Sequence, residues 1–170
     1  MPPTVYLAGP DVFYPDARAH GQRMVAVCAQ AGFTGLFPLE APLPPEPAQL
    51  SLAIFEANRA LIDRADAVVA NLRDFRGFEP DSGTVWEVSY ALARGKPVVG
   101  YCPTAATIAQ RLQASAHGQL FDAQCEVENF GLPLNLMLAH SLSAIAYGSE
   151  IDFLGLKAAL ARLRSLGPGI

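Results

Sequence analysis

The sequence predicts an α/β domain built on a parallel sheet. Short apolar runs with the length of β-strands alternate along the chain with longer segments whose apolar residues recur at helical spacing. Two of the runs, Ala67–Asn71 and Pro97–Tyr101, are almost continuously apolar, as expected of strands buried on both faces. Because strands that alternate with helices pair in parallel, we expect a single domain over residues 1–170 with helices covering the sheet.

The amino-terminal part begins with a strand and a helix. An apolar run at Val5–Ala8 ends before Gly9 and predicts the first strand, and helical spacing predicts a helix over Asp16–Ala31. Phe33–Phe37 is a candidate second strand. The segment Pro38–Pro47 has five prolines in ten residues, which is too many for a regular element. We expect a semi-rigid surface loop there, suited to walling a pocket.

The following elements lead into and out of the strand Ala67–Asn71. Apolar spacing predicts a helix over Ala48–Ala65, and a glycine turn at Asp81–Thr84 opens another helix that runs to about Arg94. Pro97–Tyr101 is then the fourth strand. In the rest of the chain we expect a weak helix at Ala105–Ala114 and a short helix from Pro133. A strand at Leu142–Tyr147 and a closing helix from Ile151 follow.

The composition restricts the class of protein. Hydrophobic residues make up 51% of the 170, enough for one domain with a sizeable core. Charged residues are only 16% and the net charge is -4, so the chain lacks the excess of basic residues that binds the phosphates of a nucleic acid polymer. The first residues do not have the pattern of a signal peptide, and no apolar run approaches the roughly 20 residues of a membrane span. We therefore expect a soluble, reduced, cytoplasmic protein.

The sequence has no recognisable metal or cofactor motif. Its three cysteines, Cys28, Cys102 and Cys125, are widely spaced without a CxxC pair, which favours small buried side chains over disulfides or a zinc site. No GxGxxG follows the first strand, and Gly95–Pro97 is not a Walker A motif because Pro97 stands where that motif has Ser or Thr. We therefore expect no metal and no cofactor, and NAD and ATP are disfavoured.

The most informative segment is Asp81–Glu87, which places two carboxylates six residues apart around Gly83. It follows a predicted strand, and open α/β sheets bind their ligands beyond the carboxyl ends of strands. Thr84-Val-Trp-Glu87 fits a capping box, in which Thr84 caps the helix and Glu87 reaches back to the Thr84 amide. Alternatively, the helix dipole holds Glu87 ionised, which suits a nucleophile. The two alternatives predict opposite orientations of the Glu87 side chain.

Other candidates are weak when taken singly. Tyr6, inside the first strand, would ordinarily be a core aromatic, and Asp81 would ordinarily be a turn or cap aspartate. Gly83 lets a ligand approach the backbone closely. Asn135 and Met137 could be only a helix-start residue and a core residue.

Five short segments together resemble the nucleoside 2-deoxyribosyltransferase family in order and spacing. They are Val5–Pro10, Ala65–Ala70, Asp81–Thr84 with Glu87, Gly95–Pro97 and Pro133–Met137. The resemblance extends over roughly residues 4–147. It implies a flavodoxin-like (Rossmann-like) three-layer fold with a five-stranded parallel sheet.

The resemblance also implies an enzyme that exchanges the nucleobase of 2′-deoxyribonucleosides in nucleoside salvage. Glu87 would attack the anomeric carbon, the free base would depart, and a second base would attack the deoxyribosyl-glutamate from the opposite face. This is the chemistry of a retaining glycosidase in which a nitrogen base outcompetes water. A 2′-hydroxyl would disfavour the oxocarbenium-like transition state, so ribonucleosides should react poorly.

The resemblance implies roles for further residues. Tyr6 would hydrogen-bond and orient Glu87, and Asp81 would accept the 5′-hydroxyl of the sugar. In the family, the residues at the positions of Asn135 and Met137 come from a neighbouring subunit. The partners would then be 2′-deoxynucleosides, free nucleobases and further copies of the chain, in a homo-oligomer with shared active sites.

One departure from the family is visible at Asn58. Many members carry an aspartate at this position, proposed to position the sugar or to protonate the base, and an amide cannot act as a general acid. That role must pass to another group or be unnecessary here. Asp11 and Asp16, in the loop after the first strand, are candidates for contacts with the base, or they are ordinary solvated loop carboxylates.

Two other functions stay open. A 2′-deoxynucleoside 5′-monophosphate N-glycosidase shares the glutamate, but a carboxylate beside the phosphate would be repelled, so Asp81 favours a nucleoside substrate. Members of that branch tend to have serines where this chain has Asp81 and Asn135. A non-catalytic nucleoside-binding sensor is disfavoured because binding alone needs neither Glu87 nor its partner Tyr6.

Overall fold

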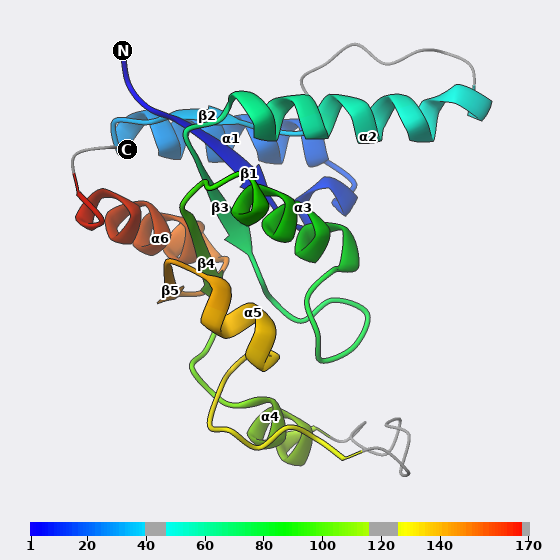
Figure 1. Cartoon of the computed structure of the whole chain (residues 1–170), viewed down its shortest axis with the longest axis vertical. Helices are drawn as coiled ribbons and strands as arrows, with labels where there is room; N and C mark the ends of the chain where they lie inside the picture. The colour runs from blue at the N-terminus through cyan, green and yellow to red at the C-terminus, as the bar shows by residue number, and fades with distance from the viewer. Residues whose placement is uncertain (40–46, 116–125, 168–170) are drawn as a thin grey trace.

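The computed structural model describes residues 1–39, 47–115 and 126–167 (Figure 1). Its centre is a sheet of five parallel strands in the order β2-β1-β3-β4-β5. The strands are β1 Thr4–Ala8, β2 Thr34–Leu36, β3 Ala67–Asn71, β4 Val98–Cys102 and β5 Ala144–Tyr147. This order is that of flavodoxin-like folds, with the change of winding direction between β1 and β3. The predicted fold class is confirmed.

Helices cover both faces of the sheet. One face packs against α1 (Ala17–Gln30) and α6 (Leu154–Ser165), and the other against α2 (Pro47–Arg64) and α3 (Ser82–Ala93), as Figure 1 shows. Apolar residues around α5 (Leu136–Ser141) join the second layer, whereas α4 (Ile108–Ala114) lies apart from the sheet. Two short 3-10 helices precede α1 and α6, η1 at Pro10–Phe13 and η3 at Ile151–Phe153.

The alternation of side chains along β1 decides which layer each residue joins. Val5 and Leu7 pack in the core on the α1 and α6 side, whereas Tyr6 and Ala8 pack on the α2 and α3 side. The same alternation runs through β3, where Asn71 is the last residue of the strand and is almost fully buried. Tyr6 therefore faces α3, the helix that carries Glu87.

The elements lie close to the ranges expected from hydrophobic spacing. The strand Ala67–Asn71 is confirmed residue for residue, and α1 and α3 end before Gly32 and Gly95, whose positive φ angles of 80° and 71° stop the helices. The helix expected from Pro133 begins only at Leu136, because Asn135 caps it. Residues 40–46 of the proline-rich loop and Cys125 lie outside the described residues.

Two of the cysteines are described, and both behave as predicted. Cys28 and Cys102 are free and buried, and burial raises the pKa of each thiol to about 12. In the described ranges, no helix combines the length and apolar character needed to cross a bilayer.

Candidate active site

Tyr6 and Glu87 meet between the sheet and α3. The hydroxyl of Tyr6, a residue with no exposed surface, donates a hydrogen bond of 2.6 Å to Oε1 of Glu87, 81 residues later in the chain. A bond this short to a carboxylate is a strong, charge-assisted one. Burial and the carboxylate both raise the pKa of Tyr6 far above its ordinary value, so the phenol remains a donor at any physiological pH.

The predicted capping box at Thr84 and Glu87 is wrong. Asp81 is the N-cap of α3, and its Oδ2 accepts hydrogen bonds from the backbone N–H of Thr84 at 2.9 Å and from the Thr84 hydroxyl at 3.1 Å. The helix thus starts three residues earlier than a Thr84 cap would require, and Glu87 lies in its second turn, directed at Tyr6. A capping box does form elsewhere, between Thr107 and Gln110 at the start of α4.

The environment of Glu87 favours its protonated form more than the sequence indicated. Burial raises its pKa from 4.5 to about 7, the hydrogen bond from Tyr6 opposes this shift, and the nearby Asp81 carboxylate adds to it. The expectation that the helix dipole holds Glu87 ionised is therefore wrong, since that effect is confined to the first turn. A carboxylate with a pKa near neutrality is poorly solvated, which increases its reactivity as a nucleophile.

Asn58 of α2 is the second polar contact of Glu87. Its Nδ2 donates to the same oxygen, Oε1, over 3.4 Å, which is a long and weak hydrogen bond. The Asn58 carbonyl oxygen, Oδ1, is buried and has no hydrogen-bond partner among the described residues. An unsatisfied buried acceptor is costly, so this oxygen is suited to receive a hydrogen bond from a ligand.

A pocket of about 320 Å³ opens beside these groups. Its lining combines polar side chains grouped around Glu87 with apolar side chains, and consists of Gly9, Val12, Phe13, Pro38, Leu39, Ile54, Asn58, Asp81, Gly83, Thr84 and Glu87. At Gly83 a side chain would begin 3.0 Å from Oδ2 of Asp81, so the glycine keeps the space beside that carboxylate open. The structure thus brings Tyr6, Asn58, Asp81, Gly83 and Glu87 together.

Residues of η1 form one apolar wall that the sequence pattern did not reveal. Val12 and Phe13 line the pocket, and the Phe13 ring stacks on Phe75 with centroids 5.2 Å apart and planes 17° from parallel. Phe13 is 54% exposed, which places it at the mouth. Nothing in the spacing of the sequence could indicate this contact, because Phe75 belongs to the loop between β3 and α3.

Asp11 and Asp16 do not line this pocket. Asp11 is 4% exposed and accepts hydrogen bonds from His20 Nε2 at 2.8 Å and from Asn71 Nδ2 at 3.0 Å, so it is not a solvated loop carboxylate. It anchors η1 against α1 and the end of β3. Asp16 is exposed and pairs with Arg23 at 2.9 Å, which lowers its pKa.

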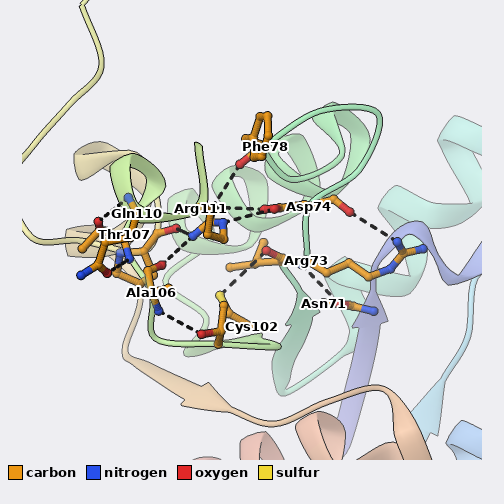
Figure 2. Close-up of polar contacts among 12 residues, drawn as sticks. Asn71, Arg73, Asp74, Phe78, Cys102, Ala106, Thr107, Gln110 and Arg111 are labelled. Atoms are coloured by element: carbon orange, nitrogen blue, oxygen red, sulfur yellow. Dashed lines mark hydrogen bonds and ion pairs between the residues drawn. The ribbon is translucent and has the colours of Figure 1, made fainter. Parts of the chain in front are cut away.

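Arg111 of α4 holds the loop that leads to Asp81. Its guanidinium contacts both carboxylate oxygens of Asp74 at 3.1 and 3.2 Å and donates to the backbone carbonyl of Phe78 at 3.1 Å, as Figure 2 shows. It also donates to the carbonyls of Ala106 at 2.7 Å and Pro133 at 2.9 Å. One partly buried side chain therefore ties the β3–α3 loop to the segment that precedes α5.

Asn135, at the end of that segment, and Met137, in the first turn of α5, lie outside the pocket of their own chain. Asn135 caps α5 by accepting from the Met137 N–H at 3.0 Å, and its Nδ2 donates to Glu128 at 2.6 Å. Met137 is 73% exposed, so it is not the core residue that its sequence context allowed. Over the ranges that the structure describes, no group of three or more His, Cys, Asp or Glu side chains is arranged to hold a metal ion.

The family comparison covers the part of the chain that holds this site. The model of the family described as nucleoside 2-deoxyribosyltransferase matches residues 5–137, which include Tyr6, Asn58, Asp81, Glu87 and Asn135. The chain belongs to this family. An uncharacterized protein of Schizosaccharomyces pombe is 38% identical over 104 residues, which are 58% of this chain and 49% of that protein. The chain thus spans about half the length of the curated relative that it matches.

Solved structures of the family share the whole fold. A 2-deoxyribosyltransferase of Leishmania mexicana is 30% identical, with a TM-score of 0.73 over 95% of this chain and 97% of that one. A 2-deoxyribosyltransferase of Bacillus psychrosaccharolyticus is 23% identical, with a TM-score of 0.55 over 88% of each chain, and is similar in fold. The family match and the Leishmania structure support an activity of the deoxyribosyltransferase kind.

Proposed function

We propose that the protein transfers the 2′-deoxyribosyl group of a deoxynucleoside from one nucleobase to another, in nucleoside salvage. The observation that carries the proposal is the contact between Tyr6 and Glu87 at the wall of a pocket that also holds Asn58 and Asp81. This arrangement sets a reactive carboxylate opposite a ligand-sized space with polar side chains for the sugar and apolar side chains for the base.

In the first step, an oxygen of Glu87 attacks the anomeric carbon while the bond from that carbon to the base nitrogen breaks and its electron pair leaves with the base. Oε1 is engaged by Tyr6 and Asn58, whereas Oε2 accepts no hydrogen bond from any described residue. Oε2 is therefore the attacking atom in this proposal. The product is a deoxyribosyl ester of Glu87 and a free base that takes a proton from solvent.

In the second step, the acceptor base attacks the same carbon from the side that the first base left. The ester bond to Oε2 breaks, Glu87 returns to its carboxylate form, and the acceptor loses its proton to solvent. Tyr6 donates to Oε1 throughout and stabilises the carboxylate each time it forms. Two inversions restore the original configuration, as in a retaining glycosidase.

Asp81 supports a nucleoside over a nucleotide as the substrate. Its Oδ2 is committed to the helix cap at Thr84, which holds the carboxylate in place among the polar side chains of the pocket. From there it can accept the 5′-hydroxyl of a deoxynucleoside. A 5′-phosphate in the same position would bring like charges within a few ångströms, in a site where Asp81 already raises the pKa of Glu87.

The exposed side chain of Met137 supports the proposal that a neighbouring subunit completes the site. Asn135 and Met137 lie outside the pocket of their own chain, and a second copy could bring them to it. Mixing subunits that carry Glu87→Ala with subunits that carry Asn135→Ala tests this. In a mixed oligomer, some sites take Glu87 from one subunit and Asn135 from the other, and these sites have both residues. Partial recovery of activity is expected, and no recovery after demonstrated subunit exchange would refute shared sites.

The central experiment incubates the protein with deoxyinosine and adenine and follows deoxyadenosine. We expect deoxyadenosine with little free deoxyribose, and no turnover by Glu87→Ala. Free deoxyribose as the only product, or cleavage confined to deoxynucleoside monophosphates, would refute the transferase in favour of an N-glycosidase. Tight nucleoside binding without turnover would identify a sensor instead.

A further inference from the structure

The apolar lining of the pocket has no described side chain that could recognise the edge of a base. The side chains of Val12, Phe13, Pro38, Leu39 and Ile54 provide only apolar contacts, whereas the polar lining side chains Asn58, Asp81, Thr84 and Glu87 are grouped around the nucleophile. A base packed against such walls gains hydrophobic and stacking energy without discrimination between one base and another. Among the described side chains, selection of the base by hydrogen bonding then falls to a group at the rim.

Arg76 is a cation stacked on an aromatic side chain at that rim. Its guanidinium carbon lies 5.2 Å from the centroid of the Phe13 ring, which lines the pocket, and 4.7 Å from that of Phe75. The two rings are themselves stacked, so the guanidinium rests on a rigid aromatic support. Arginine stacked in this way keeps its donors in the plane of the fork, free to bind acceptors at the edge.

The guanidinium of Arg76 forms no ion pair within the described structure. Arg73 and Arg111 of the same region form ion pairs with Glu150 and Asp74, whereas Arg76 is exposed and has no carboxylate partner among the described residues. Its backbone is strained, with a φ of 54° in the left-handed region that residues with side chains rarely adopt. Strain of this kind at a ligand pocket is typical of residues held in place for function.

We propose that Arg76 is a specificity residue that selects 6-oxopurines, hypoxanthine and guanine, over adenine; the inference rests on the proposed transferase function. A 6-oxopurine presents two adjacent acceptors, O6 and N7, to which a guanidinium fork donates two parallel hydrogen bonds. Adenine presents N7 beside an amino group, which is itself a donor and faces the fork unfavourably. Both edges remain free while N9 reacts with the sugar carbon near Glu87.

The test compares acceptor bases in the wild type, Arg76→Ala and Arg76→Lys. In a double displacement, kcat/KM for the acceptor does not depend on which donor formed the ester, so hypoxanthine and adenine can be compared directly. We expect the ratio of kcat/KM for hypoxanthine to that for adenine to fall about tenfold or more in Arg76→Ala. Arg76→Lys should lose the preference too, because lysine keeps the charge but not the fork.

A matched control is Arg59→Ala. Arg59 is another exposed arginine stacked on a ring, 5.5 Å from the centroid of Phe55, and neither residue lines the pocket. Its removal should leave the base ratio unchanged. A mutation cannot alter the overall equilibrium of base exchange. The ratio of kcat/KM for deoxyinosine to that for deoxyadenosine as donors must therefore shift by the same factor as the ratio for hypoxanthine to adenine as acceptors, and this equality checks the measurement.

Binding of hypoxanthine and adenine, measured by calorimetry with the wild type and Arg76→Ala, separates this inference from the transferase proposal. Weaker hypoxanthine binding with unchanged adenine binding supports the role of Arg76 even if no exchange is detected. An unchanged base ratio in both kinetics and binding overturns it. An effect of Arg76→Ala confined to deoxynucleoside 5′-monophosphates also overturns it, because Arg76 would then bind phosphate.

Discussion

Replacing Tyr6 by phenylalanine should move the pH dependence of the reaction without removing the nucleophile. The substitution deletes one hydroxyl, which donates to Glu87 Oε1 over 2.6 Å, and leaves the ring to fill the core. This hydrogen bond stabilises the carboxylate form, so the pKa of about 7 is lower than burial alone would make it. Without it the pKa of Glu87 must rise further.

The size of the shift follows from the strength of the bond. A hydrogen bond to a charged group contributes about 1.5 to 3 kcal/mol, and about 1.4 kcal/mol corresponds to one pKa unit, so the shift is about one to two units. At pH 7 the ionised fraction of Glu87 would fall from about a half to about a tenth for the smaller shift. We expect kcat/KM to fall about fivefold at pH 7, with most of it recovered near pH 9.

The assay is the pH profile of kcat/KM for a deoxynucleoside, whose acidic limb reports Glu87 in the free enzyme. Tyr90→Phe is the control, because Tyr90 also donates to a carboxylate, Asp63 at 2.9 Å, but lies away from the pocket. Its profile should match the wild type. A Tyr6→Phe enzyme that is slower by the same factor at every pH, with an unmoved acidic limb, would refute the assignment of Tyr6 as the group that tunes Glu87.

Three further substitutions have definite expected outcomes. Because folding raises the pKa of Glu87, the free energy of unfolding of the wild type should fall by about 2 kcal/mol relative to that of Glu87→Gln between pH 5 and pH 8. The same difference in unfolding free energy between the two proteins at both pH values, measured with urea, would contradict this. Asp81→Ala should lower the pKa of Glu87, the opposite of the effect of Tyr6→Phe, and should lower the free energy of unfolding by about 1 kcal/mol through the lost helix cap. An acidic limb of the pH profile that stays in place or moves to higher pH would count against this. Arg111→Ala should cost about 2 kcal/mol or more by urea unfolding, whereas Arg94→Ala, which removes an exposed ion pair with Asp63, should cost about 0.5 kcal/mol or less; equal losses would show that the Arg111 contacts add little.

The candidate site could be predicted only in part. Glu87, Tyr6 and Asp81 were found because short motifs around them resemble a family, and the structure brings them to one pocket. The roles of Asn135 and Met137 at a neighbouring site, and of Asp11 toward a base, stay predictions. Arg111 and Phe13 could not be found, because their contacts join segments that no periodicity relates.

The error at Glu87 has a physical cause. Thr84 and Glu87 have the spacing of a capping box. Asp81 and Thr84 have the spacing of an N-cap side chain and the N3 amide that it accepts from, so local geometry permits either helix start. The outcome depended on Tyr6, which offers Glu87 a strong donor from another strand. Because a side chain can satisfy one orientation at a time, the Asp81 cap set the helix start and the contact with Tyr6 set the direction of the Glu87 side chain.

The sequence by itself determined the layered α/β fold, because alternation along strands and spacing along helices are local properties that burial enforces at every residue. It also determined that Tyr6 lies on the opposite face of β1 from Val5 and Leu7. Only the tertiary structure decided the charge state of Glu87. Its pKa near 7 results from burial, from Tyr6 and from Asp81, which depend on distances between elements that no single segment encodes.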